Sequence, residues 1–167
     1  MLKYLPFFCL LFLFSCSKEE SEIAQPVSLQ APVITGYEYR DNNGNPLLHV
    51  GEPNIKTSVQ KNGFWYSMAG YPNPANRQFS IHLSVGQPIS KGKVWLVAAR
   101  QNEFQPGLNF MQAEFPVTGG QPLFEIILKP GFTNSLQPDF GTLPAGGYRI
   151  YAQLDDVLLW DNILKTN

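Results

Sequence analysis

FSIHLSV, residues 79–85, alternates strictly between apolar and polar side chains. A period of two places Phe79, Ile81, Leu83 and Val85 on one face of an extended chain and the two serines and the histidine on the other. One face is therefore suited to a core and the other to solvent. The pattern predicts a half-buried β-strand over residues 78–85.

Turn signals on both sides of this stretch extend the same pattern along the chain. Asn43-Gly44 and Asn62-Gly63 lie between strand-like runs, and Asn-Gly favours tight hairpin turns because both residues tolerate positive φ. Asp155-Asp156 marks a further hairpin turn. We predict ten strands in total, at Ile34–Arg40, Leu47–Val50, Lys56–Gln60, Phe64–Met68, Gln78–Val85, Lys93–Arg100, Asn109–Phe115, Leu123–Leu128, Gly147–Leu154 and Val157–Leu164.

One predicted strand is apolar on both faces. Val94 and Leu96 alternate with Trp95 and Val97, so both sides of this strand need cover and it belongs at the centre of a packed structure. Many short strands with turn clusters between them and no helical pattern indicate two packed sheets. We predict an all-β fold, an antiparallel β-sandwich that forms a single domain over residues 33–167.

The N-terminal residues carry a targeting signal. Lys3 is followed by an apolar run that ends at Phe14, which is typical of a secretory signal peptide and too short to span a bilayer as a helix. Leu13-Phe14-Ser15-Cys16 resembles the lipobox of bacterial lipoproteins. That resemblance implies cleavage before Cys16 and attachment to a membrane through lipid on Cys16. We therefore divide the start of the chain into a signal peptide, residues 1–15, and a lipidated cysteine with a flexible linker, residues 16–32.

The residues after the cysteine predict the location of the protein more closely. Ser17, Lys18, Glu19 and Glu20 resemble the export signal that places lipoproteins of the Bacteroidota phylum on the outer face of the outer membrane. We expect a lipid-anchored outer-membrane protein displayed on the cell surface, with a periplasm-facing anchor as the alternative. A simpler interpretation is that residues 18–22 are the solvated start of the linker.

Cysteine content and net charge bear on disulfides and on a nucleic-acid partner. The only cysteines are Cys9, in the cleaved part, and Cys16, so the remaining chain of about 152 residues has no thiol and depends on its core alone. Without residues 1–15 the chain has 11 basic and 13 acidic side chains, a net charge near −2. Because no basic stripe is present, we expect no nucleic-acid partner.

Two further segments carry a resemblance. They are Tyr71-Pro72-Asn73-Pro74-Ala75-Asn76 with the following Lys91-Gly92-Lys93-Val94-Trp95-Leu96, and Leu143-Pro144-Ala145-Gly146-Gly147-Tyr148-Arg149-Ile150. In this order they are similar to the C-terminal sorting domains recognised by the type IX secretion system. The resemblance spans residues 71–167 and implies an immunoglobulin-like sandwich. A lipobox already supplies membrane attachment, so a sorting module is the alternative function rather than the first one.

Catalytic patterns are sparse. Because the mature chain has no free thiol, a Cys-His site is excluded. Ser80, His82 and Ser84 share one strand face, but such neighbours are about 7 Å apart, which favours a solvated polar face over a Ser-His pair. Asp155 and Asp156 are assigned to a turn rather than to a glycosidase pair. We predict no catalytic residue and no cofactor, with a glycan-acting hydrolase as a further alternative.

A metal site is likewise not expected. Asp41, Asn43 and Asn45 have the spacing of a calcium-binding loop, but the position where such a loop needs its bidentate glutamate, Glu52, follows Pro46 and an apolar pair. We predict no metal ligand, and a weak calcium site at this loop is the alternative.

Aromatic residues are the features most compatible with binding. In Phe64-Trp65-Tyr66 neighbouring rings face opposite sides of a strand, so the face that is exposed decides which ring is available for binding. Trp160, on the last strand, can likewise be exposed or buried. Trp65, Tyr66 and Trp160 form the candidate binding surface, because exposed rings beside amides suit a glycan or an envelope protein. The alternative is that both strand faces are covered, one of them by a loop at residues 103–107.

The stretch from Glu103 to Gly141 is predicted either to cover the apolar edge at Val157–Trp160 or to form the rim of a binding site. Taken with the absent catalytic set, these patterns predict a non-enzymatic cell-envelope lipoprotein that acts as a binding or assembly module.

Overall fold

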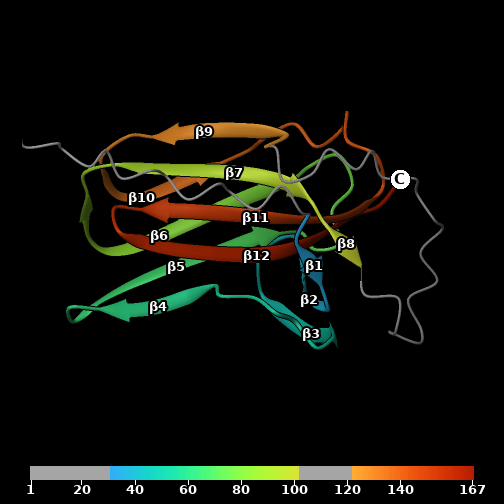
Figure 1. Cartoon of the computed structure of the whole chain (residues 1–167), viewed down its shortest axis with the longest axis horizontal. Helices are drawn as coiled ribbons and strands as arrows, with labels where there is room; N and C mark the ends of the chain where they lie inside the picture. Colours follow the sequence, from blue (N-terminus) through green and yellow to red (C-terminus); the bar gives the residue numbers. More distant parts are fainter. Residues whose placement is uncertain (1–30, 102–121) are drawn as a thin grey trace, which may run out of the picture.

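The computed structural model describes residues 31–101 and 122–167, and within those ranges it contains strands, turns and loops but no helix (Figure 1). The predicted strand at residues 109–115 lies outside the described residues. The strands are β1 (Val33–Ile34), β2 (Gly36–Arg40), β3 (Pro46–Gly51), β4 (Ser58–Lys61), β5 (Phe64–Tyr71), β6 (Ser80–Ile89), β7 (Gly92–Ala98), β8 (Arg100–Gln101), β9 (Phe124–Leu128), β10 (Gly131–Leu136), β11 (Gly146–Leu154) and β12 (Val157–Lys165).

Two four-stranded antiparallel sheets form the body of the protein. One has the order β10-β6-β5-β4 and is called here the β5–β6 sheet; the other has the order β12-β11-β7-β9 and is called the β7–β11 sheet. Figure 1 shows their strands overlapping in similar directions, with β1, β2, β3 and β8 at one end. The prediction of an antiparallel, all-β sandwich is confirmed.

Two small pairs complete the topology. Strands β2 and β3 form an antiparallel hairpin, and β1 pairs with β8 in parallel. At the start of β11 the Tyr148 hydroxyl donates a hydrogen bond of 2.7 Å to the Pro144 carbonyl oxygen. A tyrosine that bonds the backbone a few residues upstream is a hallmark of immunoglobulin-like sandwiches. The immunoglobulin-like subclass itself stays a prediction.

The alternating stretch at residues 79–85 has one buried and one outward face, as its period predicts. Ile81 and Leu83 point into the core, together with Met68 on β5, while His82 and Ser84 face outward. Strand β7 faces them from the other sheet with Leu96 fully buried. Each such side chain contributes about 1.5–3 kcal/mol when it leaves water completely. Strand β7 lies between β11 and β9, which agrees with its predicted central position.

The predicted turns are confirmed. Asn62 and Gly63 both have positive φ, 51° and 82°, between the paired residues Lys61 and Phe64. Asp155 also has a positive φ, 51°, in the turn between β11 and β12. Its carboxylate accepts hydrogen bonds from the backbone N–H groups that follow β6, at residues 90 and 91. This aspartate therefore serves a turn, as the sequence analysis proposed.

Part of the stretch at residues 103–141 belongs to the fold itself. Strand β10 forms one edge of the β5–β6 sheet, and Phe140 is fully buried. The Phe140 ring centroid lies 4.3 Å from that of Phe79 and 6.3 Å from that of Tyr148. The described end of this stretch thus supplies core and sheet rather than only a cover or a rim.

The outer edge of β12 is covered by other segments. Backbone hydrogen bonds of 2.9 and 3.0 Å join Lys56 to Trp160 in both directions. Further along, the Ala75 N–H donates to the Leu164 carbonyl at 2.7 Å, and the Ala75 carbonyl accepts from the Thr166 N–H. Among the described residues, the cover of this edge comes from segments around Lys56 and Ala75, while residues 102–121 of the stretch that was predicted to cover it lie outside the described residues.

Candidate functional site

The predicted anchor and export signal cannot be placed. Cys16 and the residues Ser17, Lys18, Glu19 and Glu20 lie outside the described residues. Among the residues that the structure does describe, no helix is long and apolar enough to cross a membrane.

Trp65 and Tyr66 lie on opposite faces of β5. Trp65 is 60% exposed and faces outward opposite Gln60 of β4. Tyr66 is buried in the core, and its hydroxyl oxygen accepts a hydrogen bond of 2.6 Å from Gln87 Nε2. Tyr66 is therefore removed from the candidate binding surface, because the alternation that exposes Trp65 turns its neighbour inward.

Trp160 is half-buried and connects β12 to the segment at residues 54–56. Its indole Nε1–H donates a hydrogen bond of 3.0 Å to the Asn54 carbonyl oxygen, and Lys56 Nζ lies 5.3 Å from the ring centroid. These contacts hold the segment at residues 54–56 against the edge of β12. Trp160 lies on the other sheet from Trp65, so the structure does not bring the predicted aromatic residues together.

Two further aromatic side chains lie in register with Trp160. Tyr151 on β11 is paired with Trp160 on one side and with Trp95 of β7 on the other. The Tyr151 and Trp95 rings stack on each other, with centroids 5.1 Å apart and an interplanar angle of 15°. Lys93 Nζ lies 5.0 Å from the Trp95 centroid and 3.1 Å from Glu125. Because the Tyr151 and Trp95 rings contact each other and Lys93 contacts Trp95, these side chains stabilise the sheet rather than forming a free aromatic surface for a ligand.

A buried ion pair holds the β2–β3 hairpin against the body. Arg40 is 3% exposed, and its Nη1 lies 2.5 Å from Asp161 Oδ2 and 3.1 Å from the Gly70 carbonyl oxygen. Arg40 Nε also donates to Glu38 at 2.7 Å. Burial alone would lower the pKa of Arg40, but the carboxylates of Asp161 and Glu38 outweigh it, and the pKa is raised. The guanidinium thus stays charged and joins three strands.

Asn73 fastens the neighbouring segment. It is fully buried, exchanges backbone hydrogen bonds with Arg40, and its Nδ2 donates to the carbonyl oxygens of Glu38 and Asn162. Its Oδ1 accepts from the Leu164 N–H at 3.0 Å. The peptide bonds that precede Pro72 and Pro74 are both cis. These contacts fix the chain between β5 and β6 beside the hairpin.

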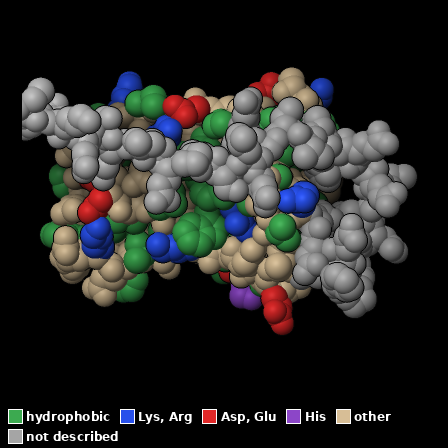
Figure 2. Space-filling model, viewed as in Figure 1, with side chains coloured by type: hydrophobic (Ala, Val, Ile, Leu, Met, Phe, Trp, Pro, Cys, Tyr) green, Lys and Arg blue, Asp and Glu red, His purple; other side chains and the backbone are tan. Residues whose placement is uncertain are grey.

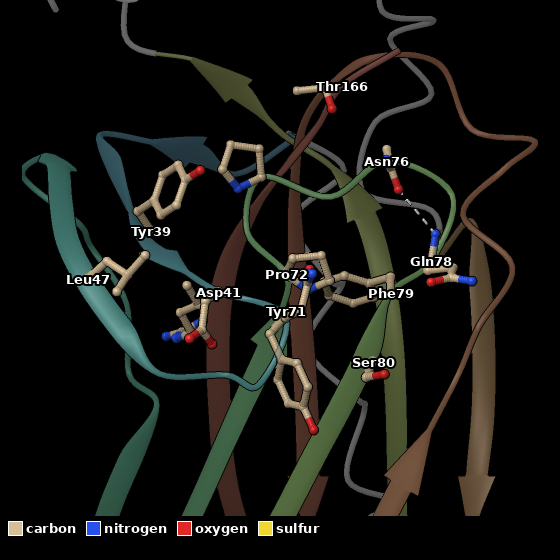
Figure 3. Close-up of a pocket in the computed structure, with 13 residues that line it drawn as sticks. Tyr39, Asp41, Leu47, Tyr71, Pro72, Asn76, Gln78, Phe79, Ser80 and Thr166 are labelled. Carbon is tan, nitrogen blue, oxygen red and sulfur yellow. Dashed lines mark hydrogen bonds between the residues drawn. The ribbon is translucent and has the colours of Figure 1, made fainter.

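An open cleft of about 620 Å³ lies between these two fixed elements (Figure 3). Tyr39 of β2 and Leu47 of β3 form one wall, and Tyr71, Phe79 and Ser80 form the other. The remaining lining residues are mostly small or neutral polar: Arg40, Asp41, Asn42, Pro72, Pro74, Asn76, Gln78 and Thr166. Tyr39 is 39% exposed and Leu47 is 58% exposed, so apolar surface is presented directly at the mouth.

Asp41 in this lining is committed to its own turn. Its Oδ1 accepts hydrogen bonds from the backbone N–H groups of Asn43 and Asn45, at 2.8 and 2.9 Å, and its Oδ2 accepts from Asn45 Nδ2. The hydrogen bond from the Asn45 side chain, with those from backbone N–H groups, lowers the pKa of Asp41. The carboxylate that suggested a calcium loop therefore caps a β-turn, and the described residues contain no cluster of three or more metal-ligating His, Cys, Asp or Glu side chains.

A second opening adjoins the first. It has a volume of about 400 Å³ and shares Gln78, Phe79 and Ser80 with the first cleft. Its far side is formed by the segment at residues 137–139. The two openings therefore follow one another along the start of β6.

The lining of this cleft combines apolar and hydrogen-bonding groups. Two tyrosine rings offer apolar faces, while amide and hydroxyl groups can donate and accept hydrogen bonds. No local sequence pattern predicts this site, because its walls come from residues 39–47, 71–80 and 166, which lie far apart along the chain. The tyrosines at both walls were the available signal.

No protein-family model matches this chain, and no curated protein or solved structure is significantly similar to it. The face of the molecule shown in Figure 2 carries interspersed basic and acidic side chains over its described part.

Proposed function

We propose that this protein is a lipid-anchored protein of the outer membrane, displayed on the cell surface, that acts as a non-enzymatic binding module. The observation that carries the proposal is the open cleft between the β2–β3 hairpin and the segment around Tyr71. Exposed rings beside neutral amides and hydroxyls are the groups with which proteins hold small or extended ligands.

The rigid surroundings of the cleft support this proposal. Arg40 and Asn73 fasten both walls through buried hydrogen bonds, so the walls are fixed before a ligand arrives. A preformed site loses little conformational entropy on binding. The lipobox at Cys16 supports a membrane-attached position, where a binding module gains from being held at the envelope.

The location is tested by protease treatment of intact cells that produce the full-length protein. We expect the protein to be degraded on intact cells. Replacing Lys18, Glu19 and Glu20 by alanine is expected to protect it until the outer membrane is opened, and Cys16→Ala is expected to release it from the membrane fraction. Protection of the unaltered protein on intact cells would contradict surface display and favour the periplasm-facing alternative.

Binding is tested with the purified full-length protein against separate polysaccharide and envelope-protein fractions. Leu47→Arg places a bulky charge at the mouth of the cleft without touching the core, since this side chain is 58% exposed. Leu123→Arg is the matched control, at a leucine that is 40% exposed and does not line the cleft. Loss of binding in Leu47→Arg alone supports the proposal; equal binding by all three proteins contradicts it.

A further inference from the structure

The outer face of the β5–β6 sheet continues from the cleft. On β5, Trp65, Ser67, Ala69 and Tyr71 face outward, because the residues between them point into the core. Tyr71 is therefore shared: it forms one wall of the cleft and also stands at the end of this sheet face.

Between the two rings, the side chains on this face are serines, an alanine and one histidine. The register pairs Ser67 with Ser58 of β4 on one side and with Ser84 of β6 on the other. His82 lies beside Ala69, and Ser80 lies beside Tyr71. None of the outward positions named here carries lysine, arginine, aspartate or glutamate, so the surface offers hydroxyl groups and little charge.

The two rings stand at the ends of this face. Trp65 and Tyr71 are six residues apart on one strand, and an extended chain advances about 3.3 Å per residue, so they are separated by about 20 Å. The outward-facing positions between them on β5 carry only Ser67 and Ala69. A linear ligand can lie along such a surface and contact a ring at each end.

We infer that the cleft and this sheet face together form an extended site for a neutral, linear polysaccharide, which runs along β5 from Tyr71 to Trp65. Sugar rings have apolar C–H faces that pack on aromatic rings and hydroxyl rims that bond to serine, amide and histidine groups. A protein partner would need a central apolar patch, and the positions between the two rings do not supply one. An acidic polysaccharide would need basic side chains, which the named outward positions lack.

This inference rests on the proposed function, since it assigns a ligand class to the same cleft. The test is affinity electrophoresis of the full-length protein. One set of gels contains a neutral polysaccharide, either a β-glucan, xylan, galactomannan or starch, and a second set contains an acidic one, alginate or hyaluronan. Short oligosaccharides of the best ligand, added as competitors, report the cleft alone. Three variants are compared: Trp65→Ala, Ser84→Arg in the middle of the face, and Ile127→Ala as a control on the other sheet, where the side chain is 70% exposed.

We expect a neutral polysaccharide to retard the protein. Trp65→Ala should weaken its binding roughly five- to thirtyfold, which corresponds to the loss of about 1–2 kcal/mol of contact with the ring, and Ser84→Arg should weaken it similarly. The affinity for short oligosaccharides that fit the cleft should stay unchanged in both variants, and Ile127→Ala should bind like the unaltered protein. Circular dichroism of each variant checks that the fold is retained.

Three results would overturn the inference in different ways. Undiminished binding of the long chain by Trp65→Ala and Ser84→Arg would refute the extended site while leaving the cleft in place. Retardation by alginate or hyaluronan in preference to every neutral polymer would refute the neutral class. Failure to bind any member of the panel would refute a glycan ligand, and an envelope protein bound through Leu47 would then identify the cleft's partner.

Discussion

Replacing Arg40 of the buried Arg40–Asp161 pair should lower the free energy of unfolding far more than replacing Asp161. Asp161 is fully buried and accepts from Arg40 Nη1, from the Gly70 N–H at 3.2 Å and from the Asn162 N–H at 2.9 Å. Arg40 is its only cationic partner among the described residues. Arg40, in contrast, also has the carboxylate of Glu38.

The magnitudes follow from these partners. In Arg40→Met the Asp161 carboxylate is left buried without a counter-charge, which costs about 3–5 kcal/mol. In Asp161→Leu the Arg40 guanidinium keeps Glu38 and the Gly70 carbonyl, so the main loss is the partner of the Gly70 N–H, at about 1–3 kcal/mol. The double variant should be little worse than Asp161→Leu, because removing the arginine no longer strands a carboxylate.

Urea unfolding of the four proteins in a double-mutant cycle measures this asymmetry. A whole domain has only about 5–15 kcal/mol of stability, so Arg40→Met is expected to shift the urea midpoint strongly, and all four proteins are therefore measured at the same low temperature. We expect a coupling energy of about 2 kcal/mol or more. Additivity of the two single changes within about 0.5 kcal/mol, or equal costs for both, would refute the assignment of Asp161 as the dependent partner.

Three other predictions follow from single contacts. Burial raises the pKa of Tyr148 from 10.0 to about 12. Its contribution to stability is therefore complete below pH 10 and is lost as the pH rises toward 12, by up to about 3 kcal/mol. The urea midpoint of the unaltered protein should decrease between pH 10 and about 12, and that of Tyr148→Phe should decrease less. Gly36→Ala should destabilise the fold by several kcal/mol, because its Cβ would lie 2.3 Å from the Val50 carbonyl oxygen; a melting temperature near that of the unaltered protein would contradict this. Trp160→Phe should cost about 1 kcal/mol through the lost bond to Asn54, and faster amide exchange at Lys56 should report the loosened edge.

Local patterns predicted most of the fold. Strand β6 follows from the alternation at residues 79–85, and the hairpin turns follow from Asn62-Gly63 and Asp155-Asp156, because period and turn chemistry act over a few residues. Strand β10 was missed because its polar centre has no alternating pattern and it begins at a glycine. Its pairing with β6 comes from the tertiary structure rather than from its own propensity.

The candidate site was predicted less well than the fold. Alternation correctly allowed for an exposed Trp65 beside a buried Tyr66, but it could not decide which ring faces out. The role of Trp160 depends on Asn54 and Lys56, which are more than a hundred residues away along the chain. The cleft likewise depends on how a hairpin at residues 36–51 docks onto the segment at Tyr71, a contact that no local pattern encodes.

The same contacts bear on the resemblance to secretion sorting domains. Asn73, in the segment that opens that resemblance, has partners on both sides of its boundary: it bonds to Glu38 and Arg40 outside residues 71–167, and to Asn162 and Leu164 within them. Residues 71–167 alone would lack nearly all of β5 and would leave Asp161 without its arginine. Shared motifs that build a fold do not by themselves carry a function, so the sorting role stays a prediction; in this fold Tyr71 and Pro72 line one wall of the cleft.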